Sequence, residues 1–328
     1  MRAQIIGVGH ALPERRLTNQ ELEQMVDTSD QWIVERSGIR ERRIADPPTK
    51  CSDLAYQAAA MALQRAGIAA RQLDLIIVAT ATPDMSFPST ACIVQDRLGA
   101  SNAAAFDLEA GCTGFIYGLD VAHKYLLSED YNYILIIGAE VLSRILNYED
   151  RNTCVLFGDG AGAAVLGKGH DGYGLLSSVI GADGSGARFL TLPAGGTAMP
   201  ASLETVQNGL HFVQMNGNEV FRFASRILPE ISSKVLQKAG YTYSDIDIFV
   251  PHQANIRIIK TAMKRMNIPA EKTLINLDKY GNISAACIPV ALSQAEEEGR
   301  LKAGDLALLV AFGAGLTYGG VLLRWGRD

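Results

Sequence analysis

The 328-residue sequence has few of the features that mark membrane, secreted, metal-binding or nucleic-acid-binding proteins. Its apolar runs stay short of the ~20 residues that span a bilayer, and Met1–His10 predicts a β-strand rather than a signal peptide. The five cysteines are scattered and lack CxxC or zinc-type spacing, which favours reduced thiols and no metal site. The net charge of −5 argues against nucleic acid as a partner. We therefore expect a cytoplasmic protein that binds no membrane, metal or nucleic acid.

An internal duplication is the main feature that the sequence does have. The segment from Leu63 to Ile77 matches that from Leu236 to Val250, at an offset of 173 residues. The same offset relates the apolar segments 134–138 and 307–311. Two separated matches at one offset indicate that a unit of about half the chain has been duplicated.

The repeated unit alternates strand-like and helix-like patterns, which predicts an α/β fold with mostly parallel central strands. We place the N-terminal half at residues 1–168 and the C-terminal half at residues 169–328. The two halves would pack about a pseudo-twofold axis, so a site between them could draw residues from both.

Cys112 follows a short apolar run, Ala103–Phe106, and precedes a helical pattern. The helix is predicted by apolar residues at i, i+4, i+7 and i+11: Phe115, Leu119, Ala122 and Leu126. With glycines on both sides, the stretch predicts a strand, a tight turn and a helix. A thiol at a helix start feels the positive end of the helix dipole, so we expect a lowered pKa for Cys112. A buried structural cysteine is the alternative.

The second half offers Cys112 two candidate partners. The end of the strand at Ala79 maps onto His252, and the cysteine turn falls near Tyr280–Asn282. A histidine can hold or exchange a proton with a nucleophilic thiol, and an asparagine adds a fixed hydrogen bond to a substrate carbonyl. The alternatives are a core histidine for His252 and a turn residue for Asn282.

Five motifs in the chain resemble those of β-ketoacyl-acyl-carrier-protein synthase III, and the similarity runs essentially end to end. They are Asp30–Arg42, Ala110–Gly114, His252–Arg257, Gly281–Ala286 and Ala311–Gly319. Related families pair their cysteine with two histidines, or with a glutamate and a histidine, whereas this chain has Asn282. The resemblance implies a thiolase-like duplicated fold layered αβαβα and a homodimer.

The resemblance also implies a reaction, in which Cys112 takes an acyl group, expected to be acetyl, from acyl-CoA. Malonyl-acyl carrier protein is then decarboxylated, and its carbanion attacks the acyl group to give 3-oxoacyl-acyl carrier protein, CO2 and CoA. His252 and Asn282 would hydrogen-bond the malonyl thioester oxygen, and the backbone N–H groups of Cys112 and Ala314 would form an oxyanion hole. This condensation initiates type II fatty-acid synthesis and needs no cofactor beyond the substrates.

Three sets of binding residues carry over from the resemblance. The residues implied for CoA are Thr28, Trp32, Arg36, Arg151, Asn218 and Asn255, with Trp32 and Arg151 on either side of the adenine. Those implied for acyl carrier protein are Gln253, Ala254, Asn255, Ile256 and Arg257. Those implied for the acyl pocket are Leu142, Leu156, Phe157 and Phe87, the last reaching into the pocket of a dimer partner.

A basic stripe just beyond His252 supports a protein partner independently of the resemblance. Arg257, Lys260 and Lys264 share one helical face, opposite an apolar face that includes Ile259 and Met263. A basic stripe on a net-acidic protein suits an acidic partner such as acyl carrier protein, whereas a solvated helix face is the alternative.

Two competing functions stay open. A relative in secondary metabolism could use the same acylated Cys112 to make a polyketide starter, a quinolone precursor or an ester. A non-catalytic or dinucleotide-binding α/β protein is prompted by Gly7-Val-Gly9 and by Gly158–Gly162, which both depart from the GxGxxG fingerprint. We expect these glycines to serve close packing between the halves instead.

Overall fold

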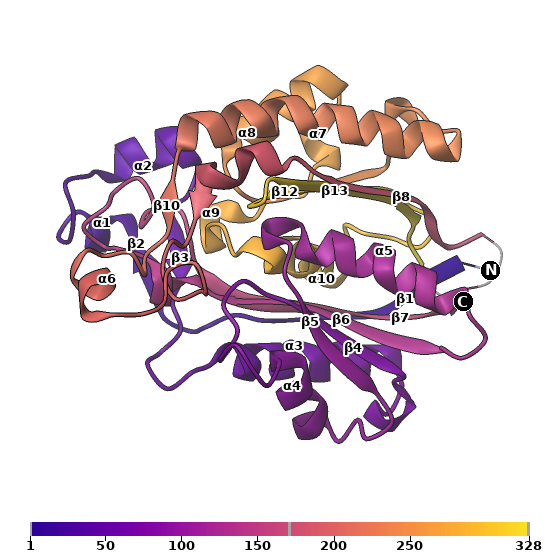
Figure 1. The fold of residues 1–328 in the computed structure, drawn as a ribbon. Coiled ribbons are helices and arrows are strands. Elements are labelled where there is room, and N and C mark those ends of the chain that lie inside the picture. Colours follow the sequence, from indigo (N-terminus) through magenta and orange to yellow (C-terminus); the bar gives the residue numbers. More distant parts are fainter. Residues whose placement is uncertain (1, 170–171, 327–328) are drawn as a thin grey trace.

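Two β-sheets are stacked with helices between them and on both outer faces, which gives five layers (Figure 1). The computed structural model describes residues 2–169 and 172–326. The outer layers are α3 (Cys51–Ala66) with α4 (Thr90–Leu98), and α7 (Gly217–Ala239) with α8 (Ile256–Met266). The central layer is α5 (Gly114–Leu126) with α10 (Cys287–Glu297). The layered αβαβα prediction is confirmed.

The first sheet has five strands in the order β1-β7-β6-β4-β5. Their bounds are β1 Arg2–Ala11, β4 Leu75–Ala79, β5 Ala104–Leu108, β6 Tyr133–Val141 and β7 Asp159–Gly169. The second sheet has four strands in the order β11-β12-β13-β8. Their bounds are β8 Gly174–Ala182, β11 Ile248–Pro251, β12 Leu306–Gly313 and β13 Thr317–Arg324. The order β1-β7-β6-β4 therefore corresponds to β8-β13-β12-β11, and β5 is an additional edge strand.

The prediction of mostly parallel strands is wrong. Only β4 with β5, β4 with β6, and β11 with β12 run parallel in the two main sheets. Strands β1, β7, β8 and β13 pair antiparallel with their neighbours. The cause is visible at β12 and β13, which follow each other after a short turn, and such a hairpin forces an antiparallel pair.

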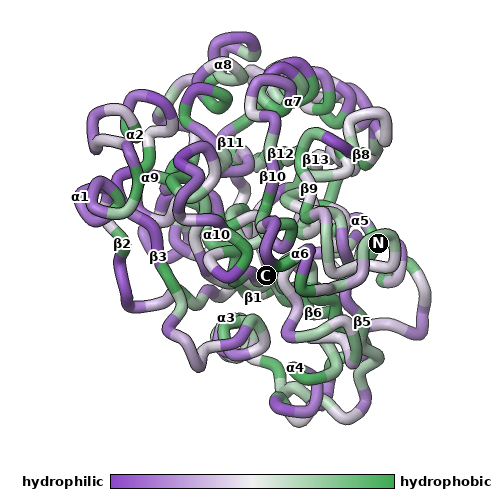
Figure 2. The backbone as a smooth tube through the Cα atoms, turned by 60° about the vertical axis from the view of Figure 1, so that its left-hand side comes forward, coloured by the Kyte–Doolittle hydropathy of each residue, from purple (hydrophilic) through white to green (hydrophobic). Residues whose placement is uncertain are grey.

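Smaller elements cover one end of the layers. They are β2 (Arg16–Thr18), α1 (Asn19–Leu22), α2 (Asp30–Ser37), β3 (Glu41–Arg43), β9 (Leu190–Thr191), α6 (Leu203–Gln207), β10 (Gln214–Met215) and α9 (Leu277–Tyr280). Their backbone trace carries more hydrophilic residues on its outer turns, while hydrophobic residues gather along the inner strands and helices (Figure 2). In the described part of the chain, no helix combines the length and apolar composition needed to cross a membrane.

The central layer holds the hydrophobic core that joins the two halves. Phe115, Leu119, Ala122 and Leu126 of α5 are all buried, as their spacing predicts. They share one core cluster with residues of both sheets and of α10. Each fully buried large apolar side chain stabilises the fold by about 1.5–3 kcal/mol. The Cys112 turn therefore leads into a helix that is fixed by packing from both halves.

The glycine-rich segments pack closely, but only one of them does so between the halves. A Cβ atom on Gly162 would lie 2.6 Å from the backbone nitrogen of Val290, in the C-terminal half. A Cβ atom on Gly7 would instead lie 2.4 Å from the carbonyl oxygen of Ala62 in α3, in the same half. The packing prediction holds for Gly162 and is corrected for Gly7.

Candidate active site

Cys112 lies in a 3-10 turn, Gly111–Thr113, that follows β5 and leads directly into α5. Gly111 has φ +52°, and a Cβ atom there would lie 2.9 Å from the backbone nitrogen of Ala314. Only glycine fits both the left-handed backbone and this close approach. Thr113 fastens the turn to β13, because its hydroxyl lies 2.6 Å from that of Thr317.

The expectation of a lowered pKa for Cys112 is wrong. Burial raises the pKa of the thiol to about 12, although hydrogen bonds from Ser284 and Asn282 act in the opposite direction. The negative charge of Glu140 raises it further. Loss of water around the sulfur therefore outweighs the start of α5, and Cys112 is a neutral thiol before substrate binds.

His252 lies directly after β11, as the duplication predicts, and is only 1% exposed. Its backbone N–H donates to Val310 at 2.8 Å, and its ring packs edge-on against Phe312. Both ring nitrogens are buried without a hydrogen-bond partner in the described structure. Burial lowers the pKa of His252 to about 3, so the imidazole is neutral at physiological pH. An unpartnered buried imidazole is available to bind a substrate oxygen.

Asn282 is held by its backbone and by its amide oxygen. The backbone N–H donates to Leu156 at 2.8 Å, and the side-chain Oδ1 accepts from the Ser284 N–H at 2.8 Å. The Cys287 thiol lies 3.8 Å from the same oxygen. Because the oxygen is held in this way, the NH2 group is the end left to face Cys112, whose pKa a hydrogen bond from Asn282 lowers.

These three side chains meet in one cavity of about 130 Å3, lined by Cys112, His252, Asn282, Phe312 and others. The cavity shares Asn255, Phe221 and Met215 with an open groove of about 650 Å3 at the surface. On its far side it shares Cys112, Phe157 and Leu190 with a largely apolar pocket of about 390 Å3. Cys112 therefore lies where a tunnel from the surface meets a blind pocket.

The two backbone groups predicted for the oxyanion hole also lie together. Ala314 lines the apolar pocket beside Cys112. A Cβ atom on Gly313 would lie 2.6 Å from the Cys112 nitrogen, and one on Gly111 would lie 2.9 Å from the Ala314 nitrogen. The loop after β12 thus brings both N–H groups to the same side of the sulfur.

Most residues predicted to bind CoA lie at the mouth of the tunnel. Its lining includes Trp32, Arg36, Asn218 and Asn255. Arg151 stacks on Trp32, with its guanidinium 5.1 Å from the ring centroid. Thr28 does not line the groove. Asn255 has a structural role as well, since its side chain accepts from the Arg257 N–H at 2.8 Å and caps α8.

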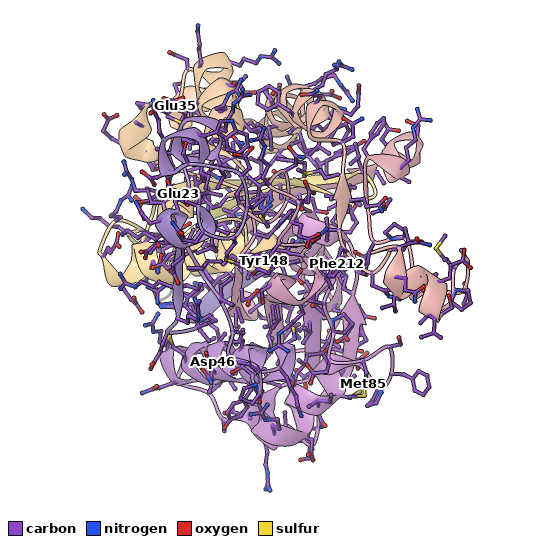
Figure 3. All side chains as sticks on the ribbon, turned by 90° about the vertical axis from the view of Figure 1, so that its left-hand side faces the viewer. Glu23, Glu35, Asp46, Met85, Tyr148 and Phe212 are labelled. Carbon is purple, nitrogen blue, oxygen red and sulfur yellow. The ribbon has the colours of Figure 1, made fainter. Side chains whose placement is uncertain are left out.

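The four residues predicted for the acyl pocket separate into three locations. Leu142 and Phe157 line the apolar pocket. Leu156 lies on the tunnel side, where it lines the groove and the small cavity, so its prediction is corrected. Phe87 is 84% exposed and does not line the pocket of its own chain. It belongs to the projecting loop that also holds Met85 (Figure 3).

The basic face of α8 is confirmed, but the predicted carrier-protein set needs one correction. Arg257, Lys260 and Lys264 are exposed, while Ile259 is buried. Gln253 is only 1% exposed and donates to the carbonyls of Pro251 and Leu274, so it cannot form a docking surface. Its side chain is turned inward to satisfy the chain after β11. Ala254 lines the small cavity and Ile256 is half-buried beside α2.

Two residues near the sulfur were not identified from the sequence. Glu140 ends the apolar run of β6 as a fully buried carboxylate, and Ser284 has the left-handed φ of +48°. A glutamate inside an otherwise apolar strand was the available signal. Across residues 2–169 and 172–326, no three His, Cys, Asp or Glu side chains gather as metal ligands.

Comparisons with known proteins agree with this geometry. Two family models match the chain: 3-oxoacyl-[acyl-carrier-protein] synthase III at residues 106–184, and the C-terminal part of the same family at residues 236–325. A β-ketoacyl-[acyl-carrier-protein] synthase III from Syntrophomonas wolfei is 69% identical over 328 residues, covering 100% of this chain and 99% of the relative.

Solved structures show the same similarity. The crystal structure of 3-oxoacyl-[acyl-carrier-protein] synthase III from Aquifex aeolicus has a TM-score of 0.91 and 46% identity, covering 98% of this chain and 100% of that one. The priming β-ketosynthase of the R1128 polyketide pathway has a TM-score of 0.90 and 33% identity, covering 99% and 97%. The chain therefore belongs to the β-ketoacyl-acyl-carrier-protein synthase III family.

Proposed function

We propose that this chain initiates type II fatty-acid synthesis by joining an acyl group on Cys112 to a malonyl unit on acyl carrier protein. As a member of its family, it is a condensing acyltransferase. The observation that supports the residue roles is that Cys112, His252 and Asn282 line one small cavity between a surface tunnel and a blind apolar pocket. The substrates supply all the groups that react, so no cofactor is proposed.

In the first half-reaction, the pantetheine arm of acyl-CoA lies in the tunnel and the acyl group points into the apolar pocket. The sulfur of Cys112 attacks the acyl carbon, and the bond from that carbon to the CoA sulfur breaks. Negative charge develops on the acyl oxygen in the transition state. The N–H groups of Cys112 and Ala314 stabilise it, and such preorganised donors act most strongly where water is excluded.

In the second half-reaction, malonyl-acyl carrier protein enters by the same tunnel. Loss of CO2 leaves a carbanion whose charge is shared with the thioester oxygen. Neutral His252 and the NH2 group of Asn282 stabilise that oxygen by hydrogen bonding. The carbanion then attacks the acyl carbon on Cys112 and releases the 3-oxoacyl product.

We also propose an acidic carrier protein as partner, a homodimer as the working state and a cytoplasmic location. The exposed basic side chains of α8 lie next to the tunnel mouth, where charge would steer an acidic carrier protein. Phe87 is exposed and lies outside its own pocket, which supports a role in the pocket of a second copy. All five cysteines are free thiols, which suits a reducing compartment.

The proposal is tested by incubating the protein with a panel of labelled acyl-CoA primers, with and without malonyl-acyl carrier protein. We expect acetyl-CoA to label Cys112 and a labelled 3-oxoacyl-acyl carrier protein to form when the second substrate is added. The apolar pocket of about 390 Å3 is larger than an acetyl group requires, so branched primers belong in the panel. Absence of labelling with every primer would contradict the proposal.

A priming role in polyketide synthesis is the second candidate. It is favoured by the 33% identity to the R1128 priming β-ketosynthase, whose TM-score of 0.90 matches that of the fatty-acid enzyme from Aquifex aeolicus closely. The same primer panel separates the two functions. Preference for a longer primer together with failure to use acetyl-CoA would favour the polyketide role.

A further inference from the structure

Glu140 is a buried carboxylate for which the reaction described above has no use. It lies at the end of β6, is 0% exposed, and forms no ion pair within the described residues. Its oxygens accept from the Thr82 hydroxyl at 2.6 Å and the Ala81 N–H at 3.2 Å. Hydrogen bonding with Ser284 is a further interaction. Burial nevertheless raises the pKa of Glu140 to about 7.

Ser284 connects this carboxylate to the cysteine. Its hydroxyl hydrogen-bonds with Glu140 on one side and with Cys112 on the other, and in both cases it lowers the pKa of that group. The backbone of Ser284 is held in place by its N–H, which donates to Asn282 at 2.8 Å. Its φ of +48° costs a non-glycine residue about 1–2 kcal/mol. Such strain persists only where the surroundings fix the conformation.

Acylation of Cys112 requires a proton acceptor, since the resting sulfur is a thiol whose pKa lies near 12. His252 is a poor acceptor in this state, because burial lowers its pKa to about 3. A carboxylate that titrates near neutral pH is better matched to the task. Glu140 has this property and is reached from the sulfur through a single hydroxyl group.

We propose that Glu140, acting through Ser284, receives the proton that Cys112 loses when it is acylated and returns it when the acyl group leaves. The proposal depends on the acylation of Cys112 set out under the proposed function. In acylation, the proton of Cys112 moves to the Ser284 oxygen while the Ser284 proton moves to Glu140. The sulfur bonds to the acyl carbon, and CoA leaves as a thiolate that takes a proton from water.

In condensation the relay runs in reverse. The carbanion forms its bond to the acyl carbon, the bond from that carbon to Cys112 breaks, and the electron pair stays on sulfur. Glu140 gives its proton back through Ser284, and the thiol is restored. Glu140 never contacts the substrate, so it acts on the sulfur only through Ser284.

Other titratable groups around Glu140 are thiols from three packed segments. Cys51 of α3, Cys112 of the 3-10 turn and Cys287 of α10 each have a pKa that the charge of Glu140 raises. Asp84 and Asp107 act on Cys51 as well. This allows a test based on sign. If Glu140 were only a fixed charge, its removal would lower the pKa of Cys112 and speed acylation, whereas loss of a proton acceptor would slow acylation.

The test measures the burst of CoA release from acetyl-CoA between about pH 5 and about pH 9 in the full-length protein and in Glu140→Gln. We expect the wild-type rate to rise with pH through about 7, the pKa of Glu140, because the ionised form is the acceptor. Glu140→Gln should lose this rise and acylate about 10²-fold more slowly. Equal or faster acylation by Glu140→Gln would overturn the proposal. If the wild-type protein is not acylated at all, the proposed function itself fails.

Further variants separate proton transfer from loss of structure. Thr82→Val removes the shortest hydrogen bond to Glu140 but leaves the relay, so the rise through neutral pH should persist. Ser284→Gly breaks the relay at a position whose φ suits glycine, and it should slow acylation as Glu140→Gln does.

The infrared difference spectrum of the wild-type protein provides a readout that needs no variant. Acylation at about pH 8 should produce the band of a protonated carboxyl group, because Glu140 is mostly ionised above a pKa of about 7. Failure of that band to form in acylated protein would count against the relay.

Discussion

The two halves place the same turn in front of the same central layer. Gly111–Thr113 leads into α5, and 173 residues later Ser284–Ala286 leads into α10. Both turns begin with a left-handed residue, Gly111 at φ +52° and Ser284 at φ +48°. Asn282 stands two residues before its turn, so the position equivalent to Cys112 is Ala285, and the sequence-based pairing with Asn282 is corrected by three residues.

The difference between the turns lies in what their side chains do. The first turn needs glycine, since a Cβ atom would press on the Ala314 nitrogen, and it presents a nucleophile. The second turn has no nucleophile at the equivalent position and presents hydrogen-bonding groups, Asn282 toward the cavity and Ser284 toward Cys112 and Glu140. One duplicated backbone has therefore become an acyl carrier on one side and a polar support on the other.

The largest effect is expected when the nucleophile is removed from the first turn. Cys112→Ala should reduce acyl transfer by at least about 10³-fold, because no other group replaces the sulfur. Decarboxylation of malonyl-acyl carrier protein should continue, since it depends on the second half. Labelled acyl incorporation and CO2 release, measured on the same preparation, check both statements. Loss of decarboxylation as well would show that the two turns do not act separately.

The reverse pattern is expected when the C-terminal half loses its donors. His252→Ala and Asn282→Ala should each slow decarboxylation by about 10²–10³-fold, the usual cost of one donor to a developing oxyanion. Acylation of Cys112 should persist. The rate of CO2 release from malonyl-acyl carrier protein is the measurement, and Cys287→Ser serves as a control that keeps a donor near the Asn282 oxygen.

Exchanging the left-handed residues tests why the turns differ. Gly111→Ser should destabilise the protein by about 1–3 kcal/mol and slow both half-reactions, because it strains the backbone and displaces Ala314. Ser284→Gly should change the unfolding free energy by less than about 1 kcal/mol and slow acylation alone. Denaturant unfolding and the two half-reaction rates separate these outcomes. Equal stability losses in both variants would contradict the different roles of the two positions.

A smaller effect is expected at the basic face of α8. Arg257 lines the tunnel mouth, so its replacement should affect CoA and carrier protein together. Lys260 and Lys264 are exposed and do not line the tunnel. The double variant Lys260→Glu/Lys264→Glu should raise KM for malonyl-acyl carrier protein by about 10-fold and leave acyl-CoA transfer unchanged. Arg71→Glu, an exposed charge reversal away from the tunnel, provides the control; an equal effect there would argue against a local docking surface.

The smallest expected effect is an unchanged rate. His252 has a pKa lowered to about 3, so it stays neutral as the pH falls from about 8 to about 5. CO2 release should therefore show no histidine titration near the ordinary value of about 6.5, whereas acylation should fall below about pH 7 as Glu140 takes up a proton. A decarboxylation rate that halves near pH 6.5 would contradict a neutral, buried His252.

Local pattern was enough to predict the turn, the helix and the duplication. The spacing of Phe115 and Leu119 fixes the buried face of α5, and the offset of 173 residues placed His252 at the end of its strand. The resemblance then supplied Asn282 and the oxyanion partner Ala314. These features depend on short-range periodicity and on motifs that can be read along the chain.

Features that depend on long-range packing were missed or reversed. The pKa of Cys112 is set by burial between α5 and the second turn, so the helix start alone gave the wrong direction. Gln253 looked like part of an exposed motif but is turned inward to bind two carbonyls. Glu140 and Ser284 meet across the two halves, 144 residues apart, and no local pattern connects them.

The intact mass of Asn282→Ala after incubation with acetyl-CoA and malonyl-acyl carrier protein tests the division of roles most directly. Because acylation would proceed and condensation would stall, the variant should accumulate with one acetyl group on Cys112, while the wild-type protein turns over and shows little. The Cys112→Ala variant should gain no mass under the same conditions. If Asn282→Ala also stays unacylated, the two turns share the first step and the proposed separation is wrong.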